Sequence, residues 1–161
     1  MPASETTCTE AAIKAGASWC VPVAVRELTQ TYHAFELFSS RHIRKLGLTT
    51  AQFSVLLVLA AGPTISCKAL SEQTFITKGS LTGVLDRLED KGLVRRVASS
   101  ADRRSSFINL TDEGRVTFER VSSKHFAYLQ QAFVAIEAEE LASIEAGFRR
   151  FRQLFNHASR S

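Results

Sequence analysis

The chain has 161 residues, which suits one domain with helical extensions, and its 45% hydrophobic content excludes a mainly disordered protein. The net charge is only +4, but eight basic and five acidic residues between Thr64 and Leu110 place a local excess of +3 in the middle of the chain. No apolar run approaches the ~20 residues of a membrane span, and residues 1–18 lack the pattern of a signal peptide. We therefore expect a cytoplasmic protein with no membrane partner.

The N-terminal part of the chain predicts an arm followed by two helices. Residues 1–18 are small and polar and predict a disordered arm, with one domain over residues 19–161. Apolar side chains at intervals of three and four predict a long helix from Val21 to Leu46, ended by Gly47. A second helix, from Ala51 to Ala61, begins after Thr49 or Thr50. It is apolar nearly all round and is therefore expected to be buried.

The middle of the chain predicts two short helices and a hairpin. Ser66 can cap a helix over residues 67–73, and Thr77 can cap a helix over residues 78–91. The second of these buries an apolar face formed by Leu81, Val84, Leu85 and Leu88. Alternating segments at 93–98 and 105–110 predict two strands, joined by the loop 99–104 as a hairpin. A polar-faced helix followed by an arginine-tipped hairpin suits DNA reading, because a helix fits the major groove while a hairpin reaches the neighbouring backbone or minor groove.

The C-terminal part predicts two more helices, from Thr111 to about Val134 and from Glu139 to His157. Both are rich in aromatic residues, as is the first long helix. They carry more apolar surface than one small module can bury, which predicts an intertwined homodimer. We expect helices over 20–47 and 112–158 to form the dimer and residues 48–112 to form the DNA-binding module.

Four fragments in order resemble a known family. They are Leu46-Gly-Leu-Thr-Thr-Ala-Gln-Phe-Ser-Val-Leu57, Leu70-Ser-Glu-Gln-Thr74, Leu81-Thr-Gly-Val-Leu-Asp-Arg-Leu-Glu-Asp-Lys-Gly-Leu-Val-Arg-Arg96, and Asp102-Arg-Arg104 followed by Leu110-Thr-Asp-Glu-Gly114. Together they resemble the MarR family of bacterial transcription regulators. The resemblance implies a mainly α winged helix-turn-helix homodimer that binds pseudo-palindromic operators in double-stranded DNA, usually as a repressor. It also implies release of DNA by a small, often aromatic and acidic, ligand or by thiol oxidation.

The predicted DNA contacts lie on the recognition helix, the first wing strand and the hairpin tip. They are Thr77, Lys78, Ser80, Thr82, Arg87, Arg95, Arg96, Arg103 and Arg104. Small polar side chains allow close approach to base edges, and a lysine reaches guanine acceptors or phosphate. The alternative is an ordinary solvated polar surface.

Individual roles are expected within this set. The family pattern Asp-x-Arg points to Arg104 as the minor-groove residue, with Asp102 bracing the loop. Arg87 has two open roles, as a phosphate contact or as a brace through Asp102. Arg95 and Arg96 alternate along the strand, so at most one of them is expected to face the phosphates well.

An aromatic stripe on the first long helix has two interpretations. Tyr32, Phe35 and Phe38 pack in the core or the dimer interface, or they line a pocket for a small aromatic or phenolic acid. In the second case Arg41 or His42 pairs with the carboxylate, and Phe53 and His125 line the same cavity.

The sequence bears on four further classes of function. Cys8, Cys20 and Cys67 are scattered and predict free thiols, which leaves a redox-sensing regulator as an alternative through Cys20 or Cys67. The four histidines lack the spacing of a zinc site. No catalytic or phosphate-loop motif is present, so neither an enzyme nor a cofactor is expected. A less specific DNA-binding protein is the other alternative, which footprinting distinguishes because it predicts no protected palindrome.

Overall fold

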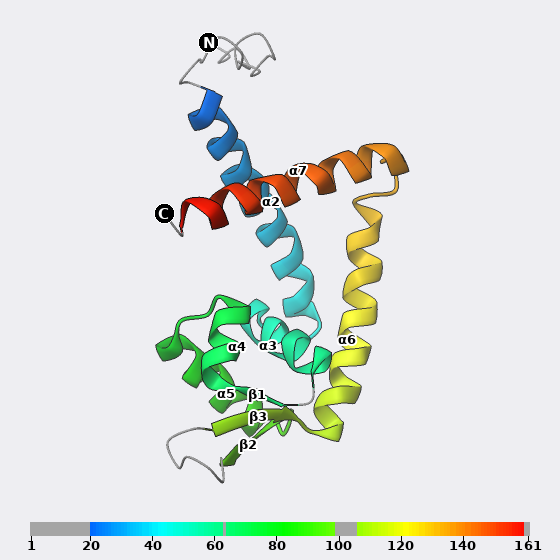
Figure 1. Cartoon of the computed structure of the whole chain (residues 1–161). Helices are drawn as coiled ribbons and strands as arrows, with labels where there is room; N and C mark the ends of the chain where they lie inside the picture. Colours follow the sequence, from blue (N-terminus) through cyan, green and yellow to red (C-terminus); the bar gives the residue numbers. More distant parts are fainter. Residues whose placement is uncertain (1–19, 63, 99–105, 160–161) are drawn as a thin grey trace, which may run out of the picture. The chain divides into compact units, whose positions relative to one another are not determined.

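The structure, a computed structural model, describes residues 20–62, 64–98 and 106–159 (Figure 1). Its elements are α2 (Cys20–Lys45), α3 (Thr50–Ala61), β1 (Ile65–Ser66), α4 (Cys67–Thr74), α5 (Lys78–Asp90), β2 (Val94–Ala98), β3 (Ser106–Leu110), α6 (Asp112–Gln131) and α7 (Ala138–Ala158). They form two compact units that divide at Ser122, within α6. The expected mainly α fold with a small β wing is confirmed, while the predicted arm at 1–18 lies outside the described residues.

The wing is a three-stranded antiparallel sheet in the order β1-β3-β2. The hairpin pairs Val94 with Leu110 and Arg96 with Ile108, as the alternation of the sequence predicts. Strand β1, which pairs Ile65 with Ile108, was not expected. A strand of two residues is too short to show alternation, so no sequence pattern predicts it.

The core of the first unit joins the helices to the wing. Leu56 of α3, Leu70 of α4, Leu88 of α5 and Ile108 of β3 are all fully buried. Val121 of α6 closes the same cluster. Burying these apolar side chains is the main favourable term in folding, and it fixes the recognition helix α5 against both α3 and the sheet.

Side-chain caps begin the helices where the sequence indicated. Thr49 caps α3, because its Oγ1 accepts from the Gln52 amide at 3.2 Å and its own amide donates to Gln52 Oε1 at 3.1 Å. Ser66 caps α4 through the Ala69 amide at 3.2 Å. Thr77 caps α5 through the Ser80 amide at 3.4 Å. These bonds, reciprocal only at Thr49, satisfy amides that have no partner in the first turn of a helix.

The start of α6 packs closely on the end of α5. Thr111 Oγ1 donates to the carbonyl of Gly92 at 2.6 Å and accepts from the amide of Gly114 at 2.9 Å. A Cβ atom at Gly114 would overlap with the backbone carbonyl of Leu93. Glycine at this position therefore permits the close approach of two backbone segments, which explains the glycine that ends the Leu-Thr-Asp-Glu-Gly fragment.

The long helices keep large apolar side chains on their surfaces. Helix α7 has no buried residue. Helix α6 ends at Gln131, three residues before the predicted end at about Val134. In α2, Ile43 is buried, whereas Tyr32 and Phe35 are exposed. Among the described residues no single helix is long and apolar enough to cross a membrane; only α2 and α3 taken together reach that length and composition, and they are bent by 85°.

Candidate DNA-binding interface

Helix α5 has an apolar face in the core and a polar face in solvent. Leu81, Leu85 and Leu88 are buried at 2% exposure or less. Thr77, Lys78, Ser80, Thr82 and Arg87 are exposed. Because apolar positions recur every three or four residues, the other side chains of the helix are turned outward, as predicted.

Three hydroxyls of this polar face already make hydrogen bonds within the helix. Thr77 Oγ1 caps α5 and donates to Ser80 Oγ at 3.1 Å, and Thr82 Oγ1 donates to the carbonyl of Lys78 at 3.2 Å. Each hydroxyl keeps further hydrogen-bonding capacity for a base or phosphate. The ammonium group of Lys78 forms no hydrogen bond or ion pair with any described residue, so it is the most available donor at this end of the helix.

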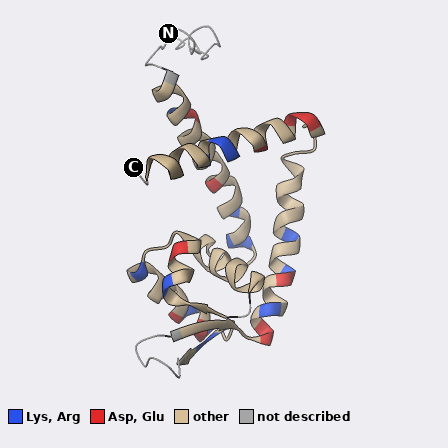
Figure 2. Cartoon of the chain, viewed as in Figure 1, with Lys and Arg blue, Asp and Glu red and all other residues tan. Residues whose placement is uncertain are grey.

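Arg96 ties the wing to the recognition helix. Its Nη2 donates to Asp86 Oδ1 at 2.6 Å and its Nη1 donates to Glu89 Oε2 at 2.8 Å, while its amide donates to Glu89 Oε1 at 3.2 Å. In Figure 2 the basic part of β2 lies beside the acidic end of α5. The hydrogen bond that Arg96 donates to Asp86 raises the pKa of the guanidinium above its usual value; partial burial opposes this shift, and the charges of Glu89 and Asp86 add to it. Its predicted role as a phosphate contact is untested, but the guanidinium is already engaged within the protein.

The remaining predicted arginines fall into two groups. Arg95 is exposed on β2, and its guanidinium forms no hydrogen bond or ion pair within the part of the chain that the structure describes. It is therefore the arginine of this strand that is available to a phosphate. Asp102, Arg103 and Arg104 lie outside the described residues, so the minor-groove and bracing roles expected of them stay predictions.

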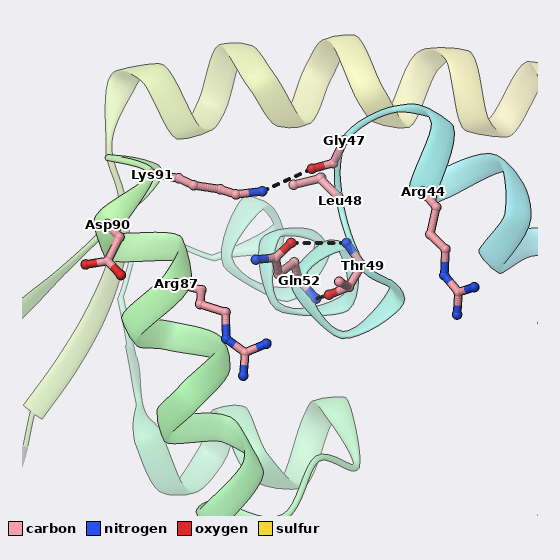
Figure 3. Close-up of a pocket in the computed structure, with 8 residues that line it drawn as sticks. All are labelled: Arg44, Gly47, Leu48, Thr49, Gln52, Arg87, Asp90 and Lys91. Carbon is pink, nitrogen blue, oxygen red and sulfur yellow. Dashed lines mark hydrogen bonds between the residues drawn. The ribbon is translucent and has the colours of Figure 1, made fainter.

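An open basic pocket of about 570 Å³ lies where α2 ends, α3 begins and α5 ends (Figure 3). Arg44, Arg87 and Lys91 bring three positive charges to it, against the carboxylate of Asp90. Lys91 Nζ donates to the carbonyl of Gly47 at 3.0 Å and so links α5 to the turn between α2 and α3. Such a charge balance suits an anion, either a DNA phosphate or a carboxylate.

This pocket was not anticipated, and it bears on the two roles left open for Arg87. The guanidinium of Arg87 stands in the pocket opposite Arg44 in Figure 3, and among the described residues it forms no ion pair. The bonds to the wing strand come from Arg96 instead. No local pattern indicates the pocket, because Lys91 and Gly47, which are bonded beside it, are 44 residues apart in sequence.

The predicted effector residues have varied environments, and none of them lines the basic pocket. Phe53 is 6% exposed and packs on Phe118 with ring centroids 6.0 Å apart, so it is part of the core. Arg41 is exposed, and Phe38 and His42 are partly buried. His125 belongs to the second unit, where its buried ring stacks on Tyr128 at 6.5 Å. Their grouping into one effector pocket stays a prediction.

Cys67 is the cysteine whose side-chain environment the structure describes. It is not part of a disulfide, and it lies partly buried at the start of α4, packed against the core. No group of three or more histidine, cysteine or acidic side chains in the described part of the chain is arranged to hold a metal ion.

The fold and the exposed face of α5 define a winged helix-turn-helix DNA-binding protein. Residues 46–105 match the MarR family. The chain belongs to this family of DNA-binding transcription regulators, and its homologues are regulators rather than enzymes.

The chain is similar to several curated transcription regulators. The HTH-type transcriptional regulator MhqR of Bacillus subtilis (strain 168) is 29% identical over 114 residues, which cover 71% of this chain and 79% of that protein. The organic hydroperoxide resistance transcriptional regulator of the same organism is 35% identical over 59% of this chain and 60% of its own length. The homoprotocatechuate degradative operon repressor of Escherichia coli is 32% identical over 60% and 63%. The match thus spans less than two thirds of the last two relatives.

Solved structures match over more of the chain. The transcriptional regulator PA4135 has a TM-score of 0.72 and 29% identity, covering 80% of this chain and 95% of that chain. The MarR C80S mutant from E. coli, solved in complex with operator DNA, has a TM-score of 0.72 and 25% identity over 81% and 94%.

Proposed function

We propose that this protein is a sequence-specific repressor that binds a pseudo-palindromic operator as a homodimer. The observation that carries the proposal is the polar N-terminal half of α5, in which Lys78 is exposed beside the hydroxyls of Ser80 and Thr82. These are side chains that read base edges in a major groove. Arg96 holds the wing against the same helix, so helix and wing present one surface to DNA.

The homodimer rests on the second unit. Leu141, Ile144, Phe148 and Phe155 of α7 are each at least 37% exposed, and no residue of this helix is buried. They recur at helical spacing on one face, so a second copy of the chain can cover them together. A two-fold dimer presents two recognition helices, which is why a palindromic operator is expected.

The proposed effector is a small aromatic acid. One relative is named for a degradative operon of homoprotocatechuate, itself an aromatic acid. Tyr32 and Phe35 offer exposed aromatic surface on α2, and Arg41 and His42 follow on the same helix. A ligand releases DNA only if it binds the DNA-incompetent arrangement more tightly. A hundredfold preference corresponds to about 2.7 kcal/mol.

A gel-shift screen with benzoate, salicylate and nicotinate tests the effector. We expect at least one acid to dissociate the operator complex, and we expect His42→Ala to blunt that response without altering ligand-free binding. His33→Ala is the matched control, since His33 is exposed on the same helix. If none of the acids acts and hydrogen peroxide releases DNA in a Cys20- or Cys67-dependent manner, the thiol-sensing alternative replaces the acid.

A further inference from the structure

Phe75, in the turn between α4 and α5, combines two unfavourable features. Its backbone is left-handed, with φ 57° and ψ 20°, and it is the only non-glycine residue with positive φ in the described part of the chain. Its side chain is 93% exposed, more than any other large hydrophobic residue described. The left-handed region disfavours residues that carry a Cβ atom, and glycine adopts it without that penalty. Within the protein, then, a phenylalanine at this position carries a conformational penalty and gains almost no burial.

The surrounding bonds hold the turn in this conformation. Ser71 Oγ donates to the carbonyl of Ile76 at 2.6 Å, and Thr74 Oγ1 donates to the carbonyl of Leu70 at 2.7 Å. Ile76 packs against the core immediately after the turn. The backbone is therefore fixed on both sides of Phe75, and its ring is held outward rather than left loose.

The position of the turn indicates which partner the ring meets. Phe75 lies two residues before Thr77, the N-cap of the recognition helix. In helix-turn-helix proteins the N-terminal residues of this helix contact base edges, so the preceding turn lies at the edge of the major groove. The adjacent Lys78 is exposed and positively charged, as a surface facing phosphates requires. In the major groove, the base feature that a phenyl ring can recognise by apolar contact is the methyl group of thymine.

We propose that Phe75 is a DNA contact whose ring packs against a thymine methyl at the edge of the major groove. This inference rests on the proposed operator binding and adds an apolar contact to it. Backbone strain is concentrated at functional sites, so a residue that is both strained and fully exposed indicates a binding site.

The test uses the full chain and a duplex selected from random DNA by the wild-type protein. Phe75→Gly should raise or preserve the Tm, because the left-handed strain is relieved, yet weaken binding to the duplex about tenfold, or ~1.4 kcal/mol. Phe75→Asn, which also tolerates this backbone, should lose affinity similarly, whereas Phe75→Leu should retain most of it. Because the contact carries no charge, the salt dependence of binding should be the same for all variants.

Replacing each thymine of a half-site by deoxyuridine identifies the contact, since it removes one methyl group. At one thymine of the half-site, replacement by deoxyuridine should weaken binding of the wild type. The same replacement should not weaken binding of Phe75→Gly any further, because that variant lacks the ring that contacts the methyl group. A Phe75→Gly protein that binds the selected duplex as tightly as the wild type overturns the contact, and a loss that couples to no thymine overturns its assignment to a methyl group. Equal wild-type binding to selected and random duplexes is a separate result, which refutes the proposed specific regulator instead.

Discussion

Arg96 of the wing strand β2 and Asp86 of the recognition helix α5 are joined by a hydrogen-bonded ion pair, Nη2 to Oδ1, at 2.6 Å. Glu89, one turn further along α5, holds the second nitrogen of the same guanidinium. A planar guanidinium that spans two carboxylates restricts orientation as well as distance. The wing is thereby oriented relative to the helix that carries the candidate base-reading residues.

Arg96→Met should cost little stability but should impair DNA binding. The arginine side chain is 32% exposed and its partners are more exposed, so solvent screening limits the pair to about 1 kcal/mol or less. With the wing no longer oriented, we expect several-fold weaker operator binding. Chemical denaturation and gel shift measure the two effects. In the control Arg95→Met, stability should not change, while binding should weaken equally for all sequences and its salt dependence should fall. Equal behaviour of the two variants would argue against the brace.

Arg87→Met should reveal what the basic pocket holds. If Arg87 neutralises one phosphate, its loss lowers the slope of log K against log salt by about one for each protomer bound. Fluorescence anisotropy at several salt concentrations measures that slope. Lys68→Met is the control, because it removes an exposed positive charge from α4 rather than from the pocket. The difference between the salt slopes of the two variants is the contribution of the pocket. An unaltered slope with a normal affinity would exclude Arg87 from the DNA contacts.

Thr77→Ala should lower the free energy of unfolding by about 1 kcal/mol, because the N-cap bond to the Ser80 amide is lost. Thr77→Asp should restore it, since aspartate is an equally good cap and its charge favours the N-terminus of a helix. Urea titration compares the three proteins. If the alanine variant is as stable as the wild type, the hydroxyl of Thr77 is not a structural cap and is retained for another purpose.

Gly114→Ala should be among the most destabilising single-methyl changes in the chain. The added Cβ atom meets a backbone carbonyl, which cannot rotate away as a side chain can. We expect a loss of ~3 kcal/mol or more, seen as a large drop in Tm. Gly147→Ala in α7 is the matched control, because its Cβ atom meets nothing within 4 Å and alanine favours helix. A small effect at Gly114 would mean that α6 can shift away from β2 at little cost.

Phe148→Asp should convert the proposed dimer to a monomer. The substitution places a charge in the apolar face of α7, which a second copy would have to desolvate. Gln153→Asp adds the same charge on the opposite face of that helix, where all side chains are exposed. Sedimentation velocity should show a monomer for the first variant and a dimer for the second. If both variants are dimers, the apolar face of α7 is not the dimer interface.

The features that sequence predicted correctly depend on local spacing. The caps at Thr49, Ser66 and Thr77 each bond to an amide three residues ahead, so a short fragment contains both partners. The apolar face of α5 follows helical periodicity in the same way. The four fragments that resemble the MarR family are also short and local, and their resemblance implied the winged helix-turn-helix fold.

The features that sequence missed depend on contacts between separate segments or on the backbone conformation of a turn. Lys91 bonds to the carbonyl of Gly47, 44 residues earlier, and that bond helps to define the basic pocket. The carboxylates that hold Arg96 come from the helix before its own strand, whereas alternation along the strand had left either Arg95 or Arg96 as the phosphate contact. The exposure of Phe75 follows from the conformation of its turn, which composition alone does not reveal.

Selection of binding sites from random duplex DNA, followed by affinity measurement at fixed salt, tests the central claim most directly. A homodimer with two recognition helices should enrich an inverted repeat whose half-sites are centred about 10 base pairs apart, or a multiple of that. It should bind this repeat at least ~10³-fold more tightly than random DNA. Enrichment of no motif, with equal affinity for both duplexes, would contradict a sequence-specific operator-binding regulator.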